Sequence, residues 1–288
     1  MSKKVRKAVI PAAGFGTRFL PVTRTIPKVM LPIIDLPAIH FSVEEAAKAG
    51  IEQVILVISR GQEATSEYFG RVPALEKALE ERGNKALLDG MLAISDMMDV
   101  THVYQDEPLG LGHSVLMAKD AVGDEPFAVF LPDDIILSDT PTIQQMIDIF
   151  DERGGAVISV KEVPDEAVPY LGIVDPEPIS DDLSRILRMV EKPKLEDAPS
   201  NLAIIGRYVL PPEIFGEIER TTPGAVGEIQ LTDALDAIRE SQGAYAYRFP
   251  GVHFDVGTPL GMLKASVHAG LLRDNIGQEF KDWLAETT

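Results

Sequence analysis

The sequence contains no cysteine and no apolar run long enough to span a lipid bilayer. The absence of cysteine excludes disulfide bonds, thiol chemistry and metal sites built on thiolates. The basic start, Met1 to Lys7, does not predict a signal peptide, because the apolar segment after it is short, is broken by Pro11 and by glycines, and leads to Arg18. We therefore predict a cytoplasmic protein.

Acidic residues are missing from the first 34 positions, although the whole chain is strongly acidic. Residues 1–34 hold seven Lys and Arg residues and no Asp or Glu, so they carry a charge of +7. The remaining 254 residues must carry −25 to give the total of −18. An acidic total disfavours nucleic acid as a partner, but a local group of cations predicts a small anionic ligand near the N-terminus.

Two common phosphate-binding motifs are incomplete or absent. Gly14-x-Gly16 lacks the third glycine of a dinucleotide-binding fingerprint, since Phe19 occupies that position, and no Gly-x4-Gly-Lys-Ser/Thr run exists. An NAD-dependent dehydrogenase and a P-loop NTPase are therefore disfavoured. An apolar stretch, Lys7–Pro11, instead predicts a buried strand that leads into a loop of small residues, Ala12–Thr17. Such a loop lets backbone N–H groups approach a phosphate, although an ordinary glycine turn would fit these residues equally well.

Buried strands and helices alternate along the first half of the chain. Continuous apolar runs at Gln53–Ser59 and Phe127–Pro132 are typical of strands that helices cover on both faces. The alternation through residue 153 predicts an α/β fold, with a Rossmann-like, mixed but mostly parallel central sheet flanked by helices. Later strands are shorter, and the stretch 164–178 is rich in proline and glycine. We place a boundary between two halves there and expect one domain over residues 1–288.

Two carboxylates occupy positions suited to binding a metal ion. Asp133 directly follows the strand Phe127–Pro132, where ligands collect in open α/β sheets, and a carboxylate there suits Mg²⁺. Asp255 precedes a predicted helix that begins near Pro259. Either residue would equally serve as an ordinary turn or helix-cap aspartate. Asp134 points away from Asp133 if the chain is extended, so we expect one of these two to be structural.

Other candidates are polar residues and glycines near the predicted strand ends. Glu191 and Lys192 end a strand and would ordinarily form a surface ion pair. A carboxylate, however, offers several acceptors to vicinal sugar hydroxyls, and Lys is a compact charge for a phosphate. Gln105 closes a strand, and its amide matches the imide edge of uracil or thymine, although a lone glutamine is more often simply exposed. Gly110 lies in a small-residue turn shortly after it.

These segments together resemble the sugar-nucleotidyltransferase family. The run Gly14-x-Gly16-Thr-Arg18, followed by Pro27-Lys28 and Leu31-Pro32, is similar to the loop with which that family wraps a nucleoside triphosphate. Asp133, Asp255 and the tripeptide Glu191-Lys192-Pro193 resemble its metal-binding and sugar-binding motifs. The runs Pro199–Val209 and Gly227–Ala234 are especially similar to the bacterial subgroup that uses UTP. The resemblance covers nearly the whole chain. The sequence departs from the family pattern at Val29, where relatives often have Glu.

The resemblance implies a reaction, in which glucose 1-phosphate attacks the α-phosphorus of UTP and gives UDP-glucose and pyrophosphate. Arg18 and Lys28 would neutralise the leaving pyrophosphate, and Lys192 would steady the attacking phosphate. The cofactor would be Mg²⁺, held by Asp133 and Asp255. The implied substrate-binding residues are Ala12, Ala13, Gly14, Gly16, Gln105, Gly110, Asp133, Gly172, Glu191 and Lys192.

The resemblance also implies two ligand-binding halves and a homo-oligomer. The nucleotide would bind to the half formed by about residues 1–163, and the sugar to a smaller β lobe within about residues 164–288. A homo-oligomer, either a dimer or a tetramer, is expected, with the C-terminal helices as candidate contacts. No nucleic acid or membrane partner is expected.

Two alternatives to this function stay open. The first is a thymidylyltransferase that uses dTTP with the same sugar phosphate, and Gln105 does not separate it because uracil and thymine share the edge that the amide would contact. The second is a non-catalytic regulatory relative that binds sugar nucleotides. Such a protein would be expected to have lost Arg18, Lys28, Asp133 or Asp255, and all four are present.

Overall fold

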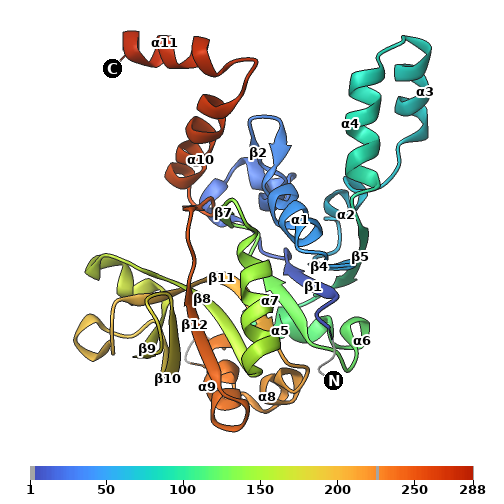
Figure 1. Ribbon diagram of the computed structural model, residues 1–288. Helices are drawn as coiled ribbons and strands as arrows, with labels where there is room; N and C mark the ends of the chain where they lie inside the picture. The colour runs from blue at the N-terminus through green and yellow to red at the C-terminus, as the bar shows by residue number, and fades with distance from the viewer. Residues whose placement is uncertain (1–3, 225–226, 288) are drawn as a thin grey trace.

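The computed structural model describes residues 4–224 and 227–287, and its centre is a nine-stranded mixed sheet (Figure 1). The strands lie in the order β5-β4-β1-β6-β11-β8-β12-β10-β9. Strands β11 and β10 run antiparallel to their neighbours, and the other seven point in one direction. The predicted mixed, mostly parallel sheet is therefore confirmed. The strand bounds are β1 Lys7–Pro11, β4 Gln53–Ile58, β5 Asp99–Tyr104, β6 Phe127–Phe130, β8 Ala156–Glu162, β9 Gly172–Pro178, β10 Leu183–Glu191, β11 Leu202–Leu210 and β12 Ala244–Arg248.

Helices cover both faces of this sheet, as the unbroken apolar strands predicted. Along β1 the side chains alternate, so that Val9 belongs to one buried cluster while Ala8 and Ile10 belong to another. Burial of a large apolar side chain stabilises a fold by about 1.5–3 kcal/mol, so these two clusters hold the layers together. The cluster around Val9 includes helices α5 Leu111–Met117, α6 Lys119–Val122, α8 Ile214–Arg220 and α9 Leu231–Gln242, and the other includes α1 Ala38–Lys48 and α7 Thr142–Arg153.

The strand order creates a crevice at one edge of the sheet. From β1 the chain moves to β4 and then to β5 on one side, and it returns to place β6 on the other side of β1. The connections that leave the carboxyl ends of β1 and β6 therefore diverge, and ligands bind at such a switch point in open α/β sheets. The segments Ala12–Thr17 and Leu131–Asp134 begin at these two strand ends.

Smaller elements surround this crevice. Strands β7 Asp134–Leu137 and β13 Val252–Asp255 form an antiparallel ribbon that the sequence did not predict. A second pair, β2 Pro32–Ile33 and β3 Leu36–Pro37, lies near it. Helices α10 Pro259–Leu272 and α11 Gly277–Thr287 extend away from the sheet at the upper left of Figure 1.

A helical hairpin projects on the other side of the crevice, at the upper right of Figure 1. It consists of α3 Pro73–Glu81 and α4 Lys85–Ser95, and the short helix α2 Ala64–Glu67 precedes it. The two helices are separated at Gly83, which adopts a left-handed conformation with φ of 66° and ends the first one. In the described ranges, no helix is long and apolar enough to cross a membrane.

Candidate functional site

The small-residue loop after β1 forms the floor of the crevice. The backbone N–H of Ala12 continues the sheet with a 2.8 Å hydrogen bond to Val57, and the carbonyl of Ala13 accepts a 3.0 Å bond from Ser59 Oγ. Gly14 is exposed to the crevice. Position 16 requires glycine, because its φ is 63° and an added Cβ would lie 2.8 Å from Lys28 Cβ.

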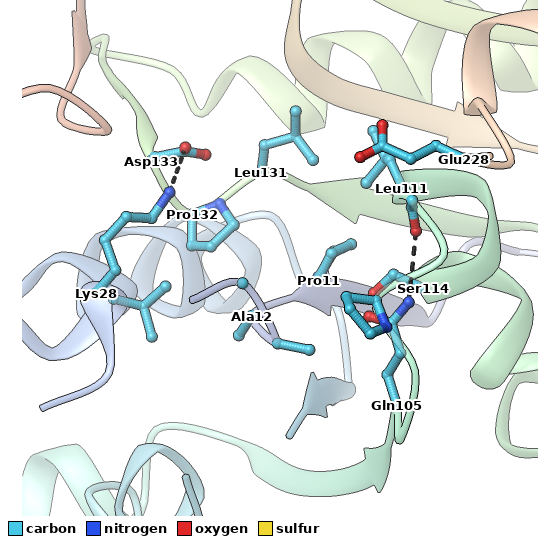
Figure 2. A pocket seen from close by; sticks show the side chains of 15 residues that line it. Pro11, Ala12, Lys28, Gln105, Leu111, Ser114, Leu131, Pro132, Asp133 and Glu228 are labelled. Atoms are coloured by element: carbon cyan, nitrogen blue, oxygen red, sulfur yellow. Dashed lines mark hydrogen bonds and ion pairs between the residues drawn. The ribbon is translucent and has the colours of Figure 1, made fainter. Parts of the chain in front are cut away.

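A cavity of about 330 Å³ opens above this loop (Figure 2). Gln105 lies against it but is only 6% exposed, so the ordinary interpretation of an exposed glutamine is wrong. Its amide nitrogen lies 2.9 Å from Nδ1 of His113, a contact that orients the amide and that the sequence did not predict. The residues that line this cavity are Pro11, Ala12, Ala13, Gly14, Lys28, Val29, Gln105, Pro108, Gly110, Leu111, Ser114, Leu131, Pro132, Asp133 and Glu228.

A second cavity of about 380 Å³ adjoins the first and shares Leu111, Leu131 and Asp133 with it. Thr232 Oγ1 donates a 2.7 Å hydrogen bond to one oxygen of the Glu191 carboxylate, and Lys192 Nζ lies 3.1 Å from the other. Gly172 pairs with Glu191 across β9 and β10, and a Cβ at Gly172 would crowd that carboxylate at 3.2 Å. These contacts place an oriented carboxylate and a cation on one wall of the cavity.

Lys192 has an unusual backbone conformation for a lysine. Its φ is 46°, which is left-handed, and its N–H donates a 3.1 Å hydrogen bond to the carbonyl of Leu171. Non-glycine residues in this region are strained by about 1–3 kcal/mol and cluster at functional sites. The strain fits the role predicted for Lys192, whose side chain is about half exposed and lines the cavity.

The two predicted metal-binding aspartates meet at the base of the β7–β13 ribbon. The carbonyl of Asp133 accepts a 2.7 Å hydrogen bond from the N–H of Val256, and Asp255 Oδ1 accepts one of 2.9 Å from Gly257. An added Cβ at Gly257 would lie 2.8 Å from the Asp133 carboxylate and 2.9 Å from that of Asp255. The glycine therefore leaves room for both carboxylates to face the same space.

Negative charge is concentrated at this point of the site. Partial burial of Asp255, and then the nearby charges of Asp134 and Asp133, raise the pKa of the Asp255 carboxyl. The N–H of Gly257 and the positive charge of Arg18 oppose that rise. Among the described residues, no cluster of three or more His, Cys, Asp or Glu side chains is arranged to hold a metal ion. A cation held here would therefore need ligands beyond the protein.

Asp134 is the structural member of the aspartate pair. Its two carboxylate oxygens contact the N–H of Gly206 at 3.3 Å and Nε2 of His253 at 2.7 Å. An added Cβ at Gly206 would lie 2.5 Å from the same carboxylate, so this position accommodates only glycine. The prediction that one of the two aspartates is structural is consistent with these contacts.

The three predicted catalytic cations line the two adjoining cavities. Lys28 Nζ forms a 2.7 Å ion pair with Asp133, which Figure 2 shows, and Lys192 faces Glu191. Arg18 is exposed on a short 3₁₀ turn, Thr17–Phe19, and lines the second cavity. Within the part of the chain that the structure describes, Arg18 makes no hydrogen bond or ion pair. Its guanidinium is therefore free to contact a ligand.

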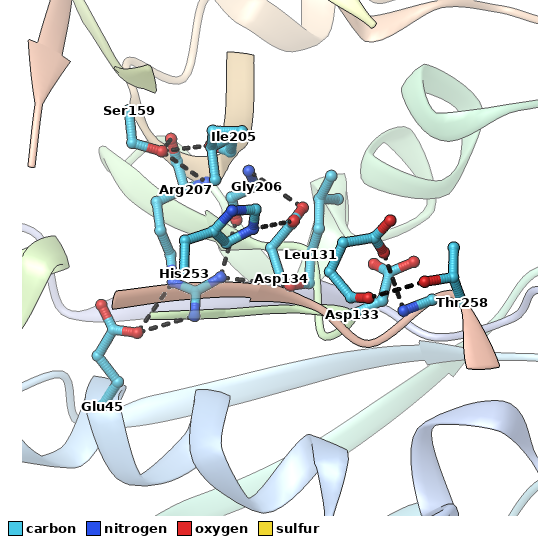
Figure 3. Close-up of polar contacts among 12 residues, drawn as sticks. Glu45, Leu131, Asp133, Asp134, Ser159, Ile205, Gly206, Arg207, His253 and Thr258 are labelled. Carbon is cyan, nitrogen blue, oxygen red and sulfur yellow. Dashed lines mark hydrogen bonds and ion pairs between the residues drawn. The ribbon is translucent and has the colours of Figure 1, made fainter. Parts of the chain in front are cut away.

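A buried ion pair beneath the site was missed from the sequence. Arg207 lies in β11 with a side chain that is 1% exposed, and it pairs with Glu45 of α1 (Figure 3). The signal that could have found it is the charge itself, because Arg207 interrupts an otherwise apolar strand and a buried charge needs a buried partner. Nothing in the sequence indicates which acidic residue supplies that partner.

Comparisons with known proteins agree with this geometry. A profile of the nucleotidyl transferase family matches residues 7–270. The UTP–glucose-1-phosphate uridylyltransferase of Staphylococcus epidermidis is 45% identical over 284 residues, which cover 99% of this chain and 99% of that protein. A solved structure of UTP-bound UGPase from Acinetobacter baumannii is 42% identical with a TM-score of 0.91, covering 99% of this chain and 100% of that chain. A UDP-glucose pyrophosphorylase complexed with UDP-glucose is 39% identical with a TM-score of 0.85, covering 93% of this chain and 100% of that chain.

Proposed function

The chain belongs to the nucleotidyl transferase family, and we propose that it transfers the uridylyl group of UTP to glucose 1-phosphate, which yields UDP-glucose and pyrophosphate. The observation that carries this proposal is the pair of adjoining cavities that share Asp133. One has a backbone loop of small residues and the oriented amide of Gln105, which suit a nucleotide. The other has an oriented carboxylate and a lysine, Glu191 and Lys192, which suit a phosphorylated sugar.

The reaction needs little proton chemistry. A phosphate oxygen of glucose 1-phosphate forms a bond to the α-phosphorus of UTP, and the bond from that phosphorus to the bridging oxygen of pyrophosphate breaks. The attacking phosphate is ionised at neutral pH, so no general base is required. The difficulty is the repulsion between two anions, and Arg18, Lys28 and Lys192 are placed to offset it. Oriented charges of this kind typically contribute a factor of about 10²–10³ in rate each.

The residues present also fit Mg²⁺ as a cofactor. Asp133 and Asp255 face one space beside Gly257, and Mg²⁺ is usually held by one or two carboxylates with substrate phosphates and water as its other ligands. A bound Mg²⁺ would supply charge neutralisation and orientation of the phosphates. Lys28 already contacts Asp133 and would have to share or leave that carboxylate when the ion binds.

A pyrophosphate-release assay tests this function. Four triphosphates, UTP, dTTP, ATP and GTP, are crossed against glucose 1-phosphate and its galactose and mannose counterparts, with and without Mg²⁺. We expect the fastest release with UTP, glucose 1-phosphate and Mg²⁺ together. Faster release with dTTP would make the protein a thymidylyltransferase, and no release with any pair would support the regulatory alternative.

We further propose that the protein acts in the cytoplasm as a homo-oligomer, a dimer or a tetramer. Exposed apolar side chains on the C-terminal helices support the assembly, since Leu263 is 64%, Leu272 69% and Trp283 55% exposed. Helix α10 buries only Ala265 and Gly270 of its fourteen residues. Light scattering should give the mass of at least two chains, and the double substitution L263E/L272E should lower it. A monomeric mass for the unaltered protein would contradict the proposal.

A further inference from the structure

The buried ion pair of Arg207 and Glu45 joins parts of the chain that are far apart in sequence. Nε and Nη2 of Arg207 donate hydrogen bonds of 2.9 and 2.8 Å to Glu45 Oε2. The other oxygen of Glu45 accepts a 3.0 Å bond from the N–H of Ile143, in the first turn of α7. The pair thus links β11, α1 and α7, and Figure 3 shows the contact between Arg207 and Glu45.

The remaining nitrogen of Arg207 reaches the segment that carries Asp133. Nη1 donates to the carbonyl of Leu131 at 3.2 Å and to that of Gly206 at 3.0 Å. The Leu131 carbonyl also accepts a 3.1 Å bond from the N–H of Asp134, which closes the turn Leu131–Asp134. The position of Asp133 on this turn is therefore set partly by Arg207.

The stability of the fold is by itself a weak explanation for the presence of a buried ion pair. Replacement of a buried ion pair by apolar residues of similar volume is often neutral or stabilising, because removing two charges from water costs free energy. Arg207 nevertheless directs its fixed, planar set of donors to a carboxylate and two carbonyls, with its guanidinium 4.8 Å from the centre of the Phe130 ring. A planar guanidinium with several fixed donors determines the geometry of its contacts as well as their strength.

We propose that Arg207 and Glu45 are positioning residues for the transfer reaction, which hold the Leu131–Asp134 turn so that the Asp133 carboxylate faces Asp255 and the phosphates. The inference rests on the proposed function. A displacement of about 1 Å in a reacting group can cost about 10²-fold in rate, so a loosened turn should slow turnover more than it weakens substrate binding. Neither residue lines either of the two adjoining cavities.

Two substitutions test the proposal. R207K keeps a positive charge opposite Glu45. It lacks the guanidinium, which donates to Glu45 and to the carbonyl of Leu131 together. We expect kcat to fall about 10- to 100-fold, with KM for UTP and glucose 1-phosphate within about threefold of the unaltered protein. E45Q loses one hydrogen-bond acceptor but keeps Arg207 near Leu131, and we expect kcat to fall by less than about 10-fold. The control is I218V, which removes a buried methylene from α8 on the other face of the sheet.

Hydrogen exchange supplies a readout that does not depend on activity. In the ligand-free protein, peptides that cover residues 127–137 should exchange faster in R207K than in the unaltered protein, and should not change in I218V. If R207K folds and its kcat and exchange both match those of I218V, the pair is only structural and the proposal is overturned. If R207K does not fold, E45Q is judged by the same two measurements. Absent turnover in the unaltered protein would count against the proposed function, whereas the exchange comparison would still decide whether the pair holds the turn.

Discussion

The negative and the positive groups of the site are held in different ways. Asp133 and Asp255 lie at the ends of paired strands, and backbone hydrogen bonds from Val256 and Gly257 fix them. Arg18 is exposed, and its side chain forms no hydrogen bond or ion pair with the described residues, while Lys192 is about half exposed. The carboxylates are thus arranged before a ligand binds. Of the three cations, Arg18 keeps the freedom to follow its phosphates, whereas Lys28 and Lys192 each form an ion pair with a carboxylate of the site.

This difference has a physical reason. Two carboxylates that face one space repel each other, so the fold must hold them there. The pKa of Asp255 is raised first by partial burial and then by the nearby charges of Asp134 and Asp133. Long cationic side chains need no such restraint, because the phosphates themselves attract them. We therefore expect the carboxylate positions to tolerate little change and the cation positions to tolerate conservative change.

The substitution D133N should have the largest effect. It removes one of the two fixed negative charges, and with it the partner of Lys28. We expect turnover to fall by at least about 10³-fold, since both charge neutralisation and phosphate orientation are lost. Pyrophosphate release at saturating Mg²⁺ measures it, with D139N, on the exposed residue Asp139, as the matched control. Retention of more than a tenth of the activity would remove Asp133 from the site.

The substitution K192A should rank second. It removes the cation that we propose to face the sugar phosphate, but it leaves Glu191 held by Thr232. We expect kcat/KM for glucose 1-phosphate to fall about 10²- to 10³-fold, while the KM for UTP changes little. The control is K194A, two residues further along the same exposed turn. Equal losses in the two variants would mean that general surface charge, and not Lys192, carries the effect.

The substitution R18K distinguishes free cations from fixed carboxylates most directly. Because the Arg18 side chain forms no hydrogen bond or ion pair with the described residues, a lysine head group should follow the phosphates nearly as well. We expect a loss of no more than about 10-fold, compared with about 10²-fold or more for R18A. Steady-state kinetics of both variants measure it. If R18K were as slow as R18A, the guanidinium would have to be held as strictly as the carboxylates.

The substitution D255N should change the free energy of unfolding only slightly, and it should raise it. Since the pKa of Asp255 is raised above its ordinary value of 3.8, the folded protein holds this proton more tightly than the unfolded chain does. The free energy of unfolding therefore falls as pH rises from 3.8 through the raised pKa, and the ionised group remains destabilising above it. Removing the charge should stabilise the ligand-free protein at pH 7, by less than about 1 kcal/mol because the group is partly exposed.

Urea unfolding of D255N and the unaltered protein at pH 7 and at pH 5 measures this gain, and the gain should shrink at the lower pH. Mg²⁺-dependent turnover should fall in the same variant, so that stability and activity change in opposite directions. A variant that is less stable at pH 7 would mean that Asp255 is held by favourable contacts and not against repulsion.

The sequence predicted the crevice well because its features are local. The unbroken apolar strand Phe127–Phe130, the small residues after Pro11 and the cations on the first loop are each readable within a few positions. Parallel strands then bring their carboxyl ends to one edge, so the residues that follow them meet there. The family resemblance supplied the pairing of Asp133 with Asp255.

What the sequence could not predict depends on contacts between distant segments. Arg207 and Glu45 are 162 positions apart. The charge of Arg207 stands out in its apolar strand, but nothing near it indicates that Glu45 is its partner. The β7–β13 ribbon is short and has no turn of its own, because its two strands lie far apart in the sequence. Likewise, the orientation of Gln105 by His113 depends on where α5 packs, which periodicity does not specify.

The β7–β13 ribbon also joins an early and a late part of the chain at the site. The residues that line the first cavity lie between Pro11 and Asp133, apart from Glu228, whereas Asp255 comes later than all of them. A product truncated ahead of Val252 would therefore keep every residue that lines the first cavity but would lack Asp255 and the backbone hydrogen bond from Val256 to Asp133.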